Sequence, residues 1–352
     1  MAMKWTLNKI LASLLALVLV VGCIAYYNIN KSSNKETEEI VEEEEVEEEV
    51  ESVSITLSFA GDITLGNYVG QGYTGSFNEK YTTVDSSYFL ENVKSVFEED
   101  DLTICNLEGP LTTQTSYQDK TYAFSGDPEY AQILVDGDVD VVTLANNHSY
   151  DYYEAGFEET KETLDDYEID YFGYSEYVVE EVKGIKIGFI GLSFPSEYGE
   201  LTTSLVNTLK EEEGCALIIL YVHWGIERDE APSSSQVALA HEWIDHGIDL
   251  VIGSHPHVVQ GIEEYNGCNI VYSLGNFCFG GNKNPDDKDS MIYQQTFTFE
   301  DGELVSQESN VIACSISSTS SSNNFQPTLL SGDEEERVLE KIESRSELIP
   351  TL

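Results

Sequence analysis

Three short histidine-bearing segments lie far apart in this chain, and each follows an apolar run. Two acidic residues end similar runs. The side chains concerned are Asp62, Glu108, Asn147, His148, His223, His255 and His257. Open α/β sheets build active sites from side chains presented at the C-terminal ends of strands. The mixture of oxygen and nitrogen donors suits zinc, manganese or iron. We therefore predict a hydrolytic centre with two metal ions, which would polarise an ester oxygen and generate hydroxide from water at neutral pH.

Each of these side chains also has an ordinary structural role open to it. Asp62 is compatible with a turn or a helix cap, and Glu108 with a solvated loop acid. Asn147 and His148 have the composition of a turn. The sharpest local signal is His255-Pro256-His257, in which two imidazoles flank a rigid residue just beyond a buried strand.

The apolar runs predict the elements that would position these residues. Strands are expected at 54–60, 101–105, 140–145, 177–182, 185–193, 216–222, 248–252 and 270–273. Helices are expected at 88–99, 153–167, 233–246 and 333–346. Strands that alternate with helices indicate an α/β fold. Segments 292–299 and 303–317 have the pattern of a hairpin, so the sheet is expected to be mixed or doubled into two packed sheets.

Other catalytic motifs are missing from the sequence. No GxSxG elbow and no GxxxxGK[ST] loop occurs, which argues against a serine hydrolase and against nucleotide binding through a P-loop. His241-Glu242 does not continue to HExxH, because Asp245 takes the place of the second histidine. His241 and His246 are therefore interpreted as surface or packing residues.

The formal net charge of −48 excludes a basic footprint for nucleic acid, so no nucleic-acid partner is expected. A polyanionic substrate would also be repelled, unless metal ions offset the charge locally. Of the six cysteines, Cys105, Cys215 and Cys278 lie in apolar runs and are expected to be buried as small apolar residues.

Residues 10–27 form an uncharged apolar stretch preceded by Lys4 and Lys9. Two interpretations of this segment remain open. The first is a single-pass transmembrane anchor near the lower length limit for crossing a bilayer. The second is a signal in which Cys23 is the lipidated residue of a bacterial lipobox. Both place the bulk of the chain on the outer side of the bacterial cell membrane, tethered to it.

The chain is accordingly expected to have three parts. Residues 1–30 are the membrane anchor or signal segment. Residues 31–53 are an acidic, disordered linker, because the nearly pure Glu/Val run repels itself and extends. Residues 54–348 form one folded domain, since no linker composition divides it.

Six motif phrases in this chain resemble, in the same order, those of the capsule synthesis protein CapA family. They are Phe59-Ala60-Gly61-Asp62, Asn106-Leu107-Glu108, Ala145-Asn146-Asn147-His148, His223-Trp224-Gly225 with Glu227, Gly253-Ser254-His255-Pro256-His257 and Tyr272-Ser273-Leu274-Gly275-Asn276-Phe277. That family is associated with poly-γ-glutamate synthesis and is similar to the calcineurin-like metallophosphoesterases. The resemblance implies their sandwich fold, in which two mixed β-sheets are flanked by helices.

The resemblance also implies a role for each matching residue. Asp62 and His257 would bind the first metal, and Glu108 would bridge the two ions. Asn147, His223 and His255 would complete the second site. His148 would lie near the leaving group as a general acid or transition-state donor. The residues implied to support the ligands or to orient substrate are Asn106, Asn146, Glu227 and Asn276.

One departure from the superfamily pattern bears on the metal count. The first superfamily motif is Asp-x-His, whereas this chain has Asp62-Ile63-Thr64. The first metal site would therefore have one imidazole fewer, so one strong and one weak site for Mn, Fe or Zn are expected. A metal-dependent, phosphoesterase-like hydrolase and a non-catalytic module that binds polymer or assembles the synthesis complex both remain open. The expected partners are poly-γ-glutamate or a related envelope polymer, the membrane and the membrane proteins of a synthesis complex.

Overall fold

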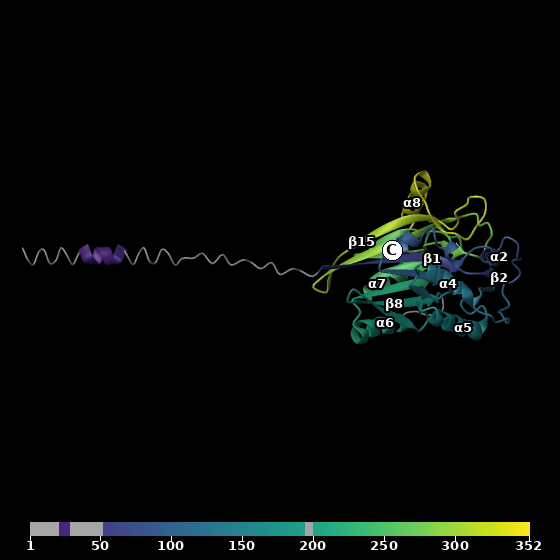
Figure 1. Cartoon of the computed structure of the whole chain (residues 1–352), viewed down its shortest axis with the longest axis horizontal. Coiled ribbons are helices and arrows are strands. Elements are labelled where there is room, and N and C mark those ends of the chain that lie inside the picture. The colour runs from purple at the N-terminus through teal and green to yellow at the C-terminus, as the bar shows by residue number, and fades with distance from the viewer. Residues whose placement is uncertain (1–20, 29–51, 194–199) are drawn as a thin grey trace, which may run out of the picture. The chain divides into compact units, whose positions relative to one another are not determined.

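The computed structural model describes residues 21–28, 52–193 and 200–352. The chain divides into two compact units, Met1–Val50 and Glu51–Leu352, and each is described by itself (Figure 1). In the first unit residues 21–28 are helical. The rest of the predicted anchor and residues 31–51 of the predicted acidic linker lie outside the described residues. Ser52 and Val53, which were predicted to belong to the linker, instead begin the first strand of the folded unit. Among the described residues, no helix has the length and apolarity needed to cross a membrane.

The larger sheet of the second unit has eight strands and is mixed. In spatial order its main path is β16 (Thr328–Leu329), β15 (Glu303–Ser315), β14 (Asp289–Glu300), β1 (Ser52–Thr64), β3 (Leu102–Leu107), β5 (Val141–Thr143) and β6 (Asp170–Phe172). The eighth strand, β13 (Asn276–Phe279), pairs in parallel with the end of β1. Because β1, β3 and β5 are parallel, their carboxyl ends meet at one edge of the sheet.

The second sheet has six strands and is also mixed. Its order is β11 (Ile262–Tyr265), β12 (Cys268–Val271), β10 (Leu250–Ser254), β9 (Leu217–His223), β8 (Ile185–Ser193) and β7 (Tyr177–Val182). The strands β8, β9, β10 and β12 are parallel, while β7 and β11 are antiparallel edge strands. A separate pair joins β2 (Asn67–Tyr68) to β4 (Phe124–Ser125).

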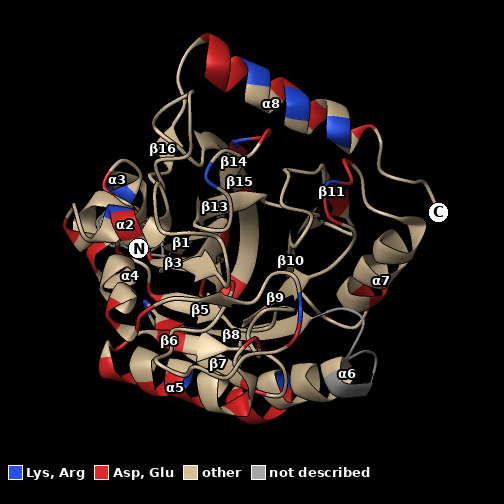
Figure 2. Ribbon diagram, turned by 90° about the vertical axis from the view of Figure 1, so that its right-hand side faces the viewer, with Lys and Arg blue, Asp and Glu red and all other residues tan. Residues whose placement is uncertain are grey.

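The helices lie outside the two sheets. They are α2 (Phe77–Tyr81), α3 (Lys94–Phe97), α4 (Ala131–Asp136), α5 (Tyr153–Asp166), α6 (Glu200–Asn207), α7 (Ser234–Asp245) and α8 (Asp333–Ser346). Short 3₁₀ turns occupy Ser86–Tyr88 and Pro128–Tyr130, and a π-helical segment occupies Thr208–Glu213. Figure 2 shows α2, α3 and α4 at one side of the sheets and α7 at the opposite side.

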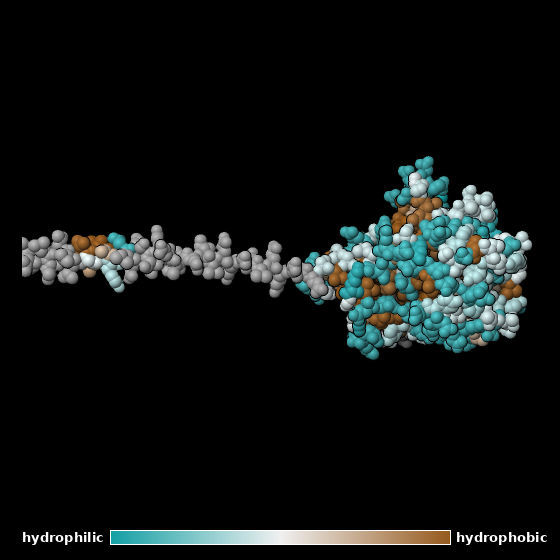
Figure 3. All heavy atoms as spheres, in the orientation of Figure 1, coloured by the Kyte–Doolittle hydropathy of each residue, from teal (hydrophilic) through white to brown (hydrophobic). Residues whose placement is uncertain are grey.

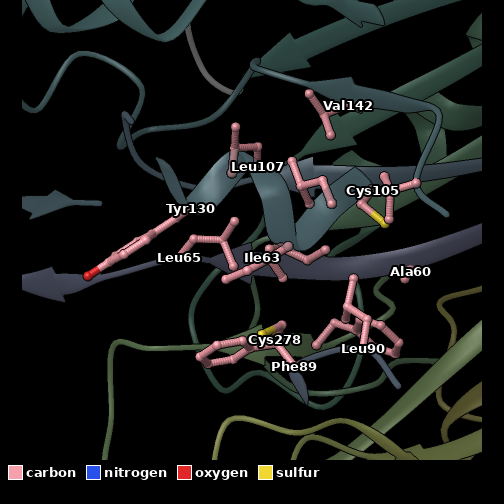
Figure 4. Close-up of a cluster of buried hydrophobic side chains, with 14 of the residues drawn as sticks. Ala60, Ile63, Leu65, Phe89, Leu90, Cys105, Leu107, Tyr130, Val142 and Cys278 are labelled. Atoms are coloured by element: carbon pink, nitrogen blue, oxygen red, sulfur yellow. The ribbon is translucent and has the colours of Figure 1, made fainter. Parts of the chain in front are cut away.

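Three apolar clusters hold these layers together. One cluster lies between the sheets, where Phe59 of β1, Ile104 of β3, Phe189 of β8 and Ile252 of β10 are all buried. The other two lie between each sheet and its helices, and Figure 4 shows part of the one beneath α4, with Ile63, Leu107 and Val142. The predicted mixed α/β arrangement, with several sheets flanked by helices, is thus confirmed.

Local sequence explains where the clearest helix begins. Ser233 precedes α7 and its hydroxyl accepts a hydrogen bond from Gln236 N at 3.3 Å, while Ser233 N donates to Gln236 Oε1 at 3.0 Å. This reciprocal capping box gives the backbone N–H groups of Ser233 and Gln236 a hydrogen-bond acceptor each, and it stabilises a helix by about 1 kcal/mol. Val237, Ala240 and Trp243 then form the buried face that packs on the second sheet.

The continuous helix predicted over 88–99 is wrong. The structure has only a 3₁₀ turn at Ser86–Tyr88 and the single turn α3. Phe89, Leu90 and Val93 retain helical spacing and are buried against the larger sheet. Burial of these side chains, rather than a continuous hydrogen-bond ladder, holds this segment, so tertiary packing overrides the helical pattern.

Candidate metal centre

Five strands direct the predicted site residues to one place. Asp62 lies at the end of β1, Glu108 directly follows β3 and Asn147 lies in the turn after β5. His223 ends β9, and His255 directly follows β10. The first three strands belong to the larger sheet and the last two to the six-stranded sheet. The site therefore lies where the carboxyl ends of both sets of parallel strands meet.

Gly61 sets the position of Asp62. A side chain at Gly61 would place its Cβ only 1.9 Å from the carbonyl oxygen of Gly275, so the backbones of β1 and the segment before β13 approach closely only with glycine there. The β1–β3 register shifts between Ala60 and Asp62, and such an irregularity re-aims the following side chain. Asp62 N donates to Gly275 O at 3.0 Å, which holds the carboxylate at the strand end.

Asp62 is fully buried and surrounded by donors. Its Oδ1 accepts a hydrogen bond from Asn106 Nδ2 at 2.8 Å, and its Oδ2 accepts one from His255 N at 3.3 Å. His257 Nδ1 lies 3.2 Å from Oδ2. Burial alone would raise the pKa of Asp62, but the hydrogen bond and positive charge of His257 outweigh it and lower the pKa to about 2.

Glu108 has a buried oxygen without a hydrogen-bond partner. Thr64 Oγ1 lies 3.5 Å from Oε2, whereas Oε1 accepts no hydrogen bond from the described residues. Three imidazole nitrogens surround Oε1, namely Nε2 of His148 at 3.9 Å, of His223 at 3.8 Å and of His257 at 3.9 Å. Burial raises the pKa of Glu108 to about 7, although the positive charge of His257 opposes this shift.

The histidine turn after β10 has an unusual backbone. His255 has φ 95° and His257 has φ 57°, both in the left-handed region, with Pro256 between them. Such conformations cost roughly 1–3 kcal/mol for residues other than glycine and gather at functional sites. They direct both imidazoles toward Asp62 and His223. His257 Nδ1 also lies 2.9 Å from Asn276 Oδ1, which fixes the orientation of the ring.

Two groups of potential ligands can be distinguished. The carboxylate cluster comprises Asp62, Glu108 and His257, whose ligand atoms all lie within 4.8 Å of one another. The imidazole group comprises Asn147, His223 and His255. In it, His223 Nε2 lies 2.9 Å from both Asn147 Oδ1 and His255 Nδ1. A single ring N–H cannot satisfy both neighbours, so these donor atoms converge without completing a hydrogen-bond network.

The electrostatics of the two groups differ. Burial opposes a charge on His257, yet Glu108 and Asp62 outweigh it and raise the pKa of His257 to about 10. Burial lowers the pKa of His223 well below its usual range, and burial together with the charge of His257 lowers the pKa of His255. His223 and His255 are consequently neutral at pH 7, the form in which imidazole binds metal.

His148 points into the same space from its own hydrogen-bonded assembly. Its Nδ1 lies 2.7 Å from Asp151 Oδ2, and Lys120 forms an ion pair with Asp151 Oδ1. The ring packs against Phe124 with a centroid distance of 4.6 Å. Asp151 orients the imidazole so that Nε2 faces Glu108. The sequence analysis missed Asp151, although its place three residues after His148 is a local signal that could have indicated it.

The residues expected to support the ligands divide into two sets. Asn106, Asn146 and Asn276 are buried, and Asn146 Nδ2 donates to Asn106 Oδ1 at 3.0 Å. Asn106 Nδ2 in turn lies 3.3 Å from His223 Nδ1, so this asparagine contacts both groups. Glu227, in contrast, is exposed and lines the cavity beside the centre rather than contacting a ligand atom.

A cavity of about 370 Å³ opens next to the centre, and His148, His257 and Asn276 form its floor. Tyr122, Phe124 and Phe279 give it an aromatic wall. The charged residues that line it are Glu227, Arg228, Glu230, Asp286, Asp287 and Arg345. The cavity can therefore admit a ligand of small-molecule size to the group of predicted metal ligands.

Several known proteins are similar to this chain in sequence. The family model for the bacterial capsule synthesis protein PGA_cap matches residues 56–281. The PGA biosynthesis protein CapA of Bacillus subtilis (strain 168) is 31% identical over 254 residues, which cover 64% of this chain and 63% of that protein. The capsule biosynthesis protein CapA of Bacillus anthracis is 29% identical over 257 residues, covering 65% of this chain and 61% of that protein.

A more distant relative is the probable polyglutamine synthesis accessory protein Rv0574c of Mycobacterium tuberculosis (strain ATCC 25618 / H37Rv). It is 25% identical over 207 residues, which cover 50% of this chain and 54% of that protein. The chain spans less than two thirds of the length of these curated relatives. The family model, however, matches more than half of the chain and includes every residue assigned to the centre. The chain belongs to the family of bacterial capsule synthesis proteins.

Proposed function

We propose that the convergent residues form a centre for divalent metal ions with hydrolase-type activity. The observation that carries this proposal is Glu108 Oε1, a buried oxygen that accepts no hydrogen bond from the described residues and faces three imidazole nitrogens at 3.8–3.9 Å. A buried carboxylate oxygen in this position is costly to leave unpaired, and a cation would satisfy it. Oxygen and imidazole donors of this kind fit Mn, Fe or Zn.

The two groups suggest how ions would be held. Asp62 and His257 would bind one ion, and Asn147, His223 and His255 the other, with Glu108 between them. A bound divalent ion supplies Lewis acidity, which polarises an ester oxygen and acidifies water. Thr64 supplies no imidazole to the first ion, so that site is expected to be the weaker one. The arrangement belongs to a calcineurin-like metallophosphoesterase sandwich.

His148 would act as the proton donor to the leaving group. Its Nδ1 is engaged by Asp151 at 2.7 Å, so its Nε2 is left to face the centre and the cavity. The ion pair of Lys120 with Asp151 keeps that carboxylate in place. A positioned histidine of this kind contributes about 10²–10⁴-fold to the rate of a proton-transfer step. Phe124 excludes water from one side of the ring.

The similarity to capsule synthesis proteins supports a proposal for the biological setting. We assign the chain to synthesis, export or anchoring of a capsule polymer such as poly-γ-glutamate, on the outer side of a bacterial membrane to which residues 1–30 tether it. Membrane proteins of a synthesis complex would be its partners. The net charge of −48 opposes direct binding of an acidic polymer, so divalent cations would also be needed to bridge the two.

The decisive experiment combines metal analysis with turnover. The fragment 51–352, a compact unit, would be purified, its bound metal counted, and its hydrolysis of a chromogenic phosphodiester followed with Mn²⁺, Fe²⁺ and Zn²⁺. His223→Ala and His255→Ala are expected to lose metal and turnover together. Activity that survives both substitutions in a metal-free protein would refute the proposal.

A non-catalytic module for polymer binding or complex assembly is the second candidate. It is favoured by Thr64, whose hydroxyl lies 3.5 Å from Glu108 at a position where the resemblance implies a histidine ligand. In that case the protein would bind polymer but would show no turnover with any of the three ions. Polymer binding that resists chelation and the histidine substitutions would favour this candidate over the hydrolase.

A further inference from the structure

The C-terminal helix α8 presents a row of three basic side chains, and they are spaced four residues apart. They are Arg337, Lys341 and Arg345. Because residues at this spacing share one helix face, all three meet carboxylates of the main body. Figure 2 shows basic and acidic residues alternating along α8, which stands over the sheets. The three partners differ in exposure, and that difference carries the inference.

Arg337 and Lys341 share a partner whose carboxylate is buried. Arg337 forms a two-pronged pair with Asp289, at 2.7 Å for each nitrogen–oxygen contact. Lys341 contacts Asp289 at 2.7 Å and Asp287 at 2.8 Å. The Asp289 side chain is only 9% exposed, and its pair with the two cations outweighs burial and lowers its pKa. These pairs hold α8 against the start of β14 and the residues just before it.

Arg345 is paired in the opposite way. Its side chain is 5% exposed, but its partner Glu230 is 67% exposed. Arg345 Nη2 donates to Glu230 Oε1 at 2.8 Å, and Nη1 donates to Val259 O. A buried guanidinium needs an anion beside it, whereas an exposed carboxylate returns to water at little cost. Both side chains line the cavity.

The backbone around Arg345 is fixed from two sides. Ile262 N donates to Ser346 Oγ at 2.9 Å, and a side chain at Gly261 would place its Cβ 2.5 Å from the Cα of Ser346. This close approach ties α8 to the segment that follows the histidine turn. The backbone that carries Arg345 is therefore held without Glu230, and its guanidinium keeps the hydrogen bond to Val259 O as a second contact.

We infer that Arg345 is the binding group for a carboxylate on the ligand of the cavity, and that Glu230 occupies it until that ligand arrives. The inference rests on the proposed function only in taking this cavity as the substrate cavity. A guanidinium fork matches a planar carboxylate, and the exchange of one carboxylate for another leaves Arg345 paired throughout. The aromatic wall of Tyr122, Phe124 and Phe279 fits an aliphatic body, so the ligand class is a carboxylic acid with an apolar spacer.

The other charges around the cavity restrict where an anion can bind. Glu227 and Asp286 repel it, and Asp287 is already held by Lys341. Arg228 and Arg345 are the two arginines that line the cavity among the described residues. A singly charged carboxylate that replaces Glu230 leaves Arg345 paired and adds one negative charge at the cavity, whereas a phosphate dianion would add two, which these acids oppose more strongly.

The test measures binding without metal or turnover, using the full chain in excess chelator. Ligand-observed NMR titrations would compare hexanoate with hexanamide, which have the same carbon chain and differ in charge. Glu230→Gln is expected to bind hexanoate about tenfold more tightly, because the internal competitor is gone, while hexanamide binding stays unchanged. Arg345→Gln is expected to lose about tenfold in hexanoate affinity with no change for hexanamide.

The matched control is Arg337→Gln, which removes an ion pair from the same helix without touching the cavity and should leave both titrations unchanged. If Arg345→Gln fails to fold, Glu230→Gln decides alone, because its side chain is exposed. Unchanged hexanoate affinity in Glu230→Gln would overturn the inference. Tighter binding of inorganic phosphate than of hexanoate, with the same dependence on Arg345, would also overturn it. Absence of turnover in the phosphodiester assay leaves this result intact, so the two proposals fail separately.

Discussion

The carboxylate cluster and the imidazole group lie side by side, but the cost of burying their polar side chains is offset in different ways. In the carboxylate cluster the charges of Asp62 and His257 offset each other, and Glu108 keeps an unpaired oxygen. In the imidazole group, neutral side chains contact one another at 2.9 Å. Neutral donors can tolerate close contact with each other, whereas like-charged carboxylates must be held apart by the surrounding fold. Most of the free-energy cost of assembling the centre therefore falls on the carboxylate cluster, where the surrounding fold must hold buried charges together.

The largest expected effect is that of Glu108→Gln. The substitution removes the group proposed to lie between the ions, so turnover should fall by roughly a thousandfold, since Lewis-acid stabilisation is worth several kcal/mol and each 1.36 kcal/mol is tenfold. Steady-state kinetics with saturating Mn²⁺ would measure it. In chelator the same variant should melt at or above the wild-type temperature, because a buried unpaired carboxylate is gone. A lower melting temperature would contradict the comparison drawn above.

The next effect is that of His148→Ala, which leaves both groups intact. Turnover should fall by about a hundredfold or more as the proton donor is lost, while bound metal per chain stays the same. Metal analysis and kinetics on one preparation would check both. Asp151→Asn is the companion variant, expected to shift the pH profile of turnover more than the metal content. Loss of metal in His148→Ala would make this residue a ligand instead.

Asn106→Ala tests whether the two groups act together. Asn106 donates to Asp62 Oδ1 at 2.8 Å and lies 3.3 Å from His223 Nδ1, so it orients one member of each. Substitution of a residue that orients a metal ligand typically weakens metal affinity by about 10–100-fold. A Mn²⁺ titration should therefore show weakening of both binding events. If a single event weakened, the two groups would be independent.

The smallest effect is the release of protons on metal binding. His257, with a pKa raised to about 10, is protonated in the metal-free protein at pH 8.5, and metal binding requires the neutral ring. Glu108, with a pKa of about 7, adds a second proton at pH 6. About one proton should be released at pH 8.5 and about two at pH 6, so affinity rises with pH. Calorimetry in buffers of different ionisation enthalpy would count them.

The source of those protons sharpens the comparison further. The lowered pKa values of His223 and His255 leave the imidazole group without a proton to release at pH 8.5. His257→Ala should therefore reduce the count by about one at pH 8.5, whereas His255→Ala should leave it unchanged. Equal counts in the two variants would mean that the two groups titrate as one.

Much of the architecture could be predicted from the sequence, because an apolar run that ends in a polar residue indicates a buried strand. The runs before Asp62, Glu108 and His223 correspond to β1, β3 and β9. The roles of these residues as metal ligands stay predictions. The 88–99 segment shows the limit, since its helical spacing serves packing against the sheet and not a continuous helix.

Residues that act through tertiary contacts had no local signature. Arg345 has the ordinary appearance of a cation on an amphipathic helix, and only the folded chain brings it to Glu230 and the cavity. The left-handed backbone conformations of His255 and His257 could not be predicted either, because Pro256 restricts the backbone without specifying those conformations. The sequence thus predicts candidate site residues at strand ends, but it does not indicate a residue such as Arg345, which reaches the cavity from a distant helix.

Gly61 has a practical consequence for anyone who transplants or diversifies this centre. With the Gly275 carbonyl 1.9 Å from any Cβ there, the position tolerates no side chain unless β1 and β13 separate. A library that varies residues around the centre should therefore hold this glycine constant, and a graft of β1 into another scaffold must carry the 274–276 segment with it. Asp62 and Asn276 are register partners across that contact, so they have to be transferred together.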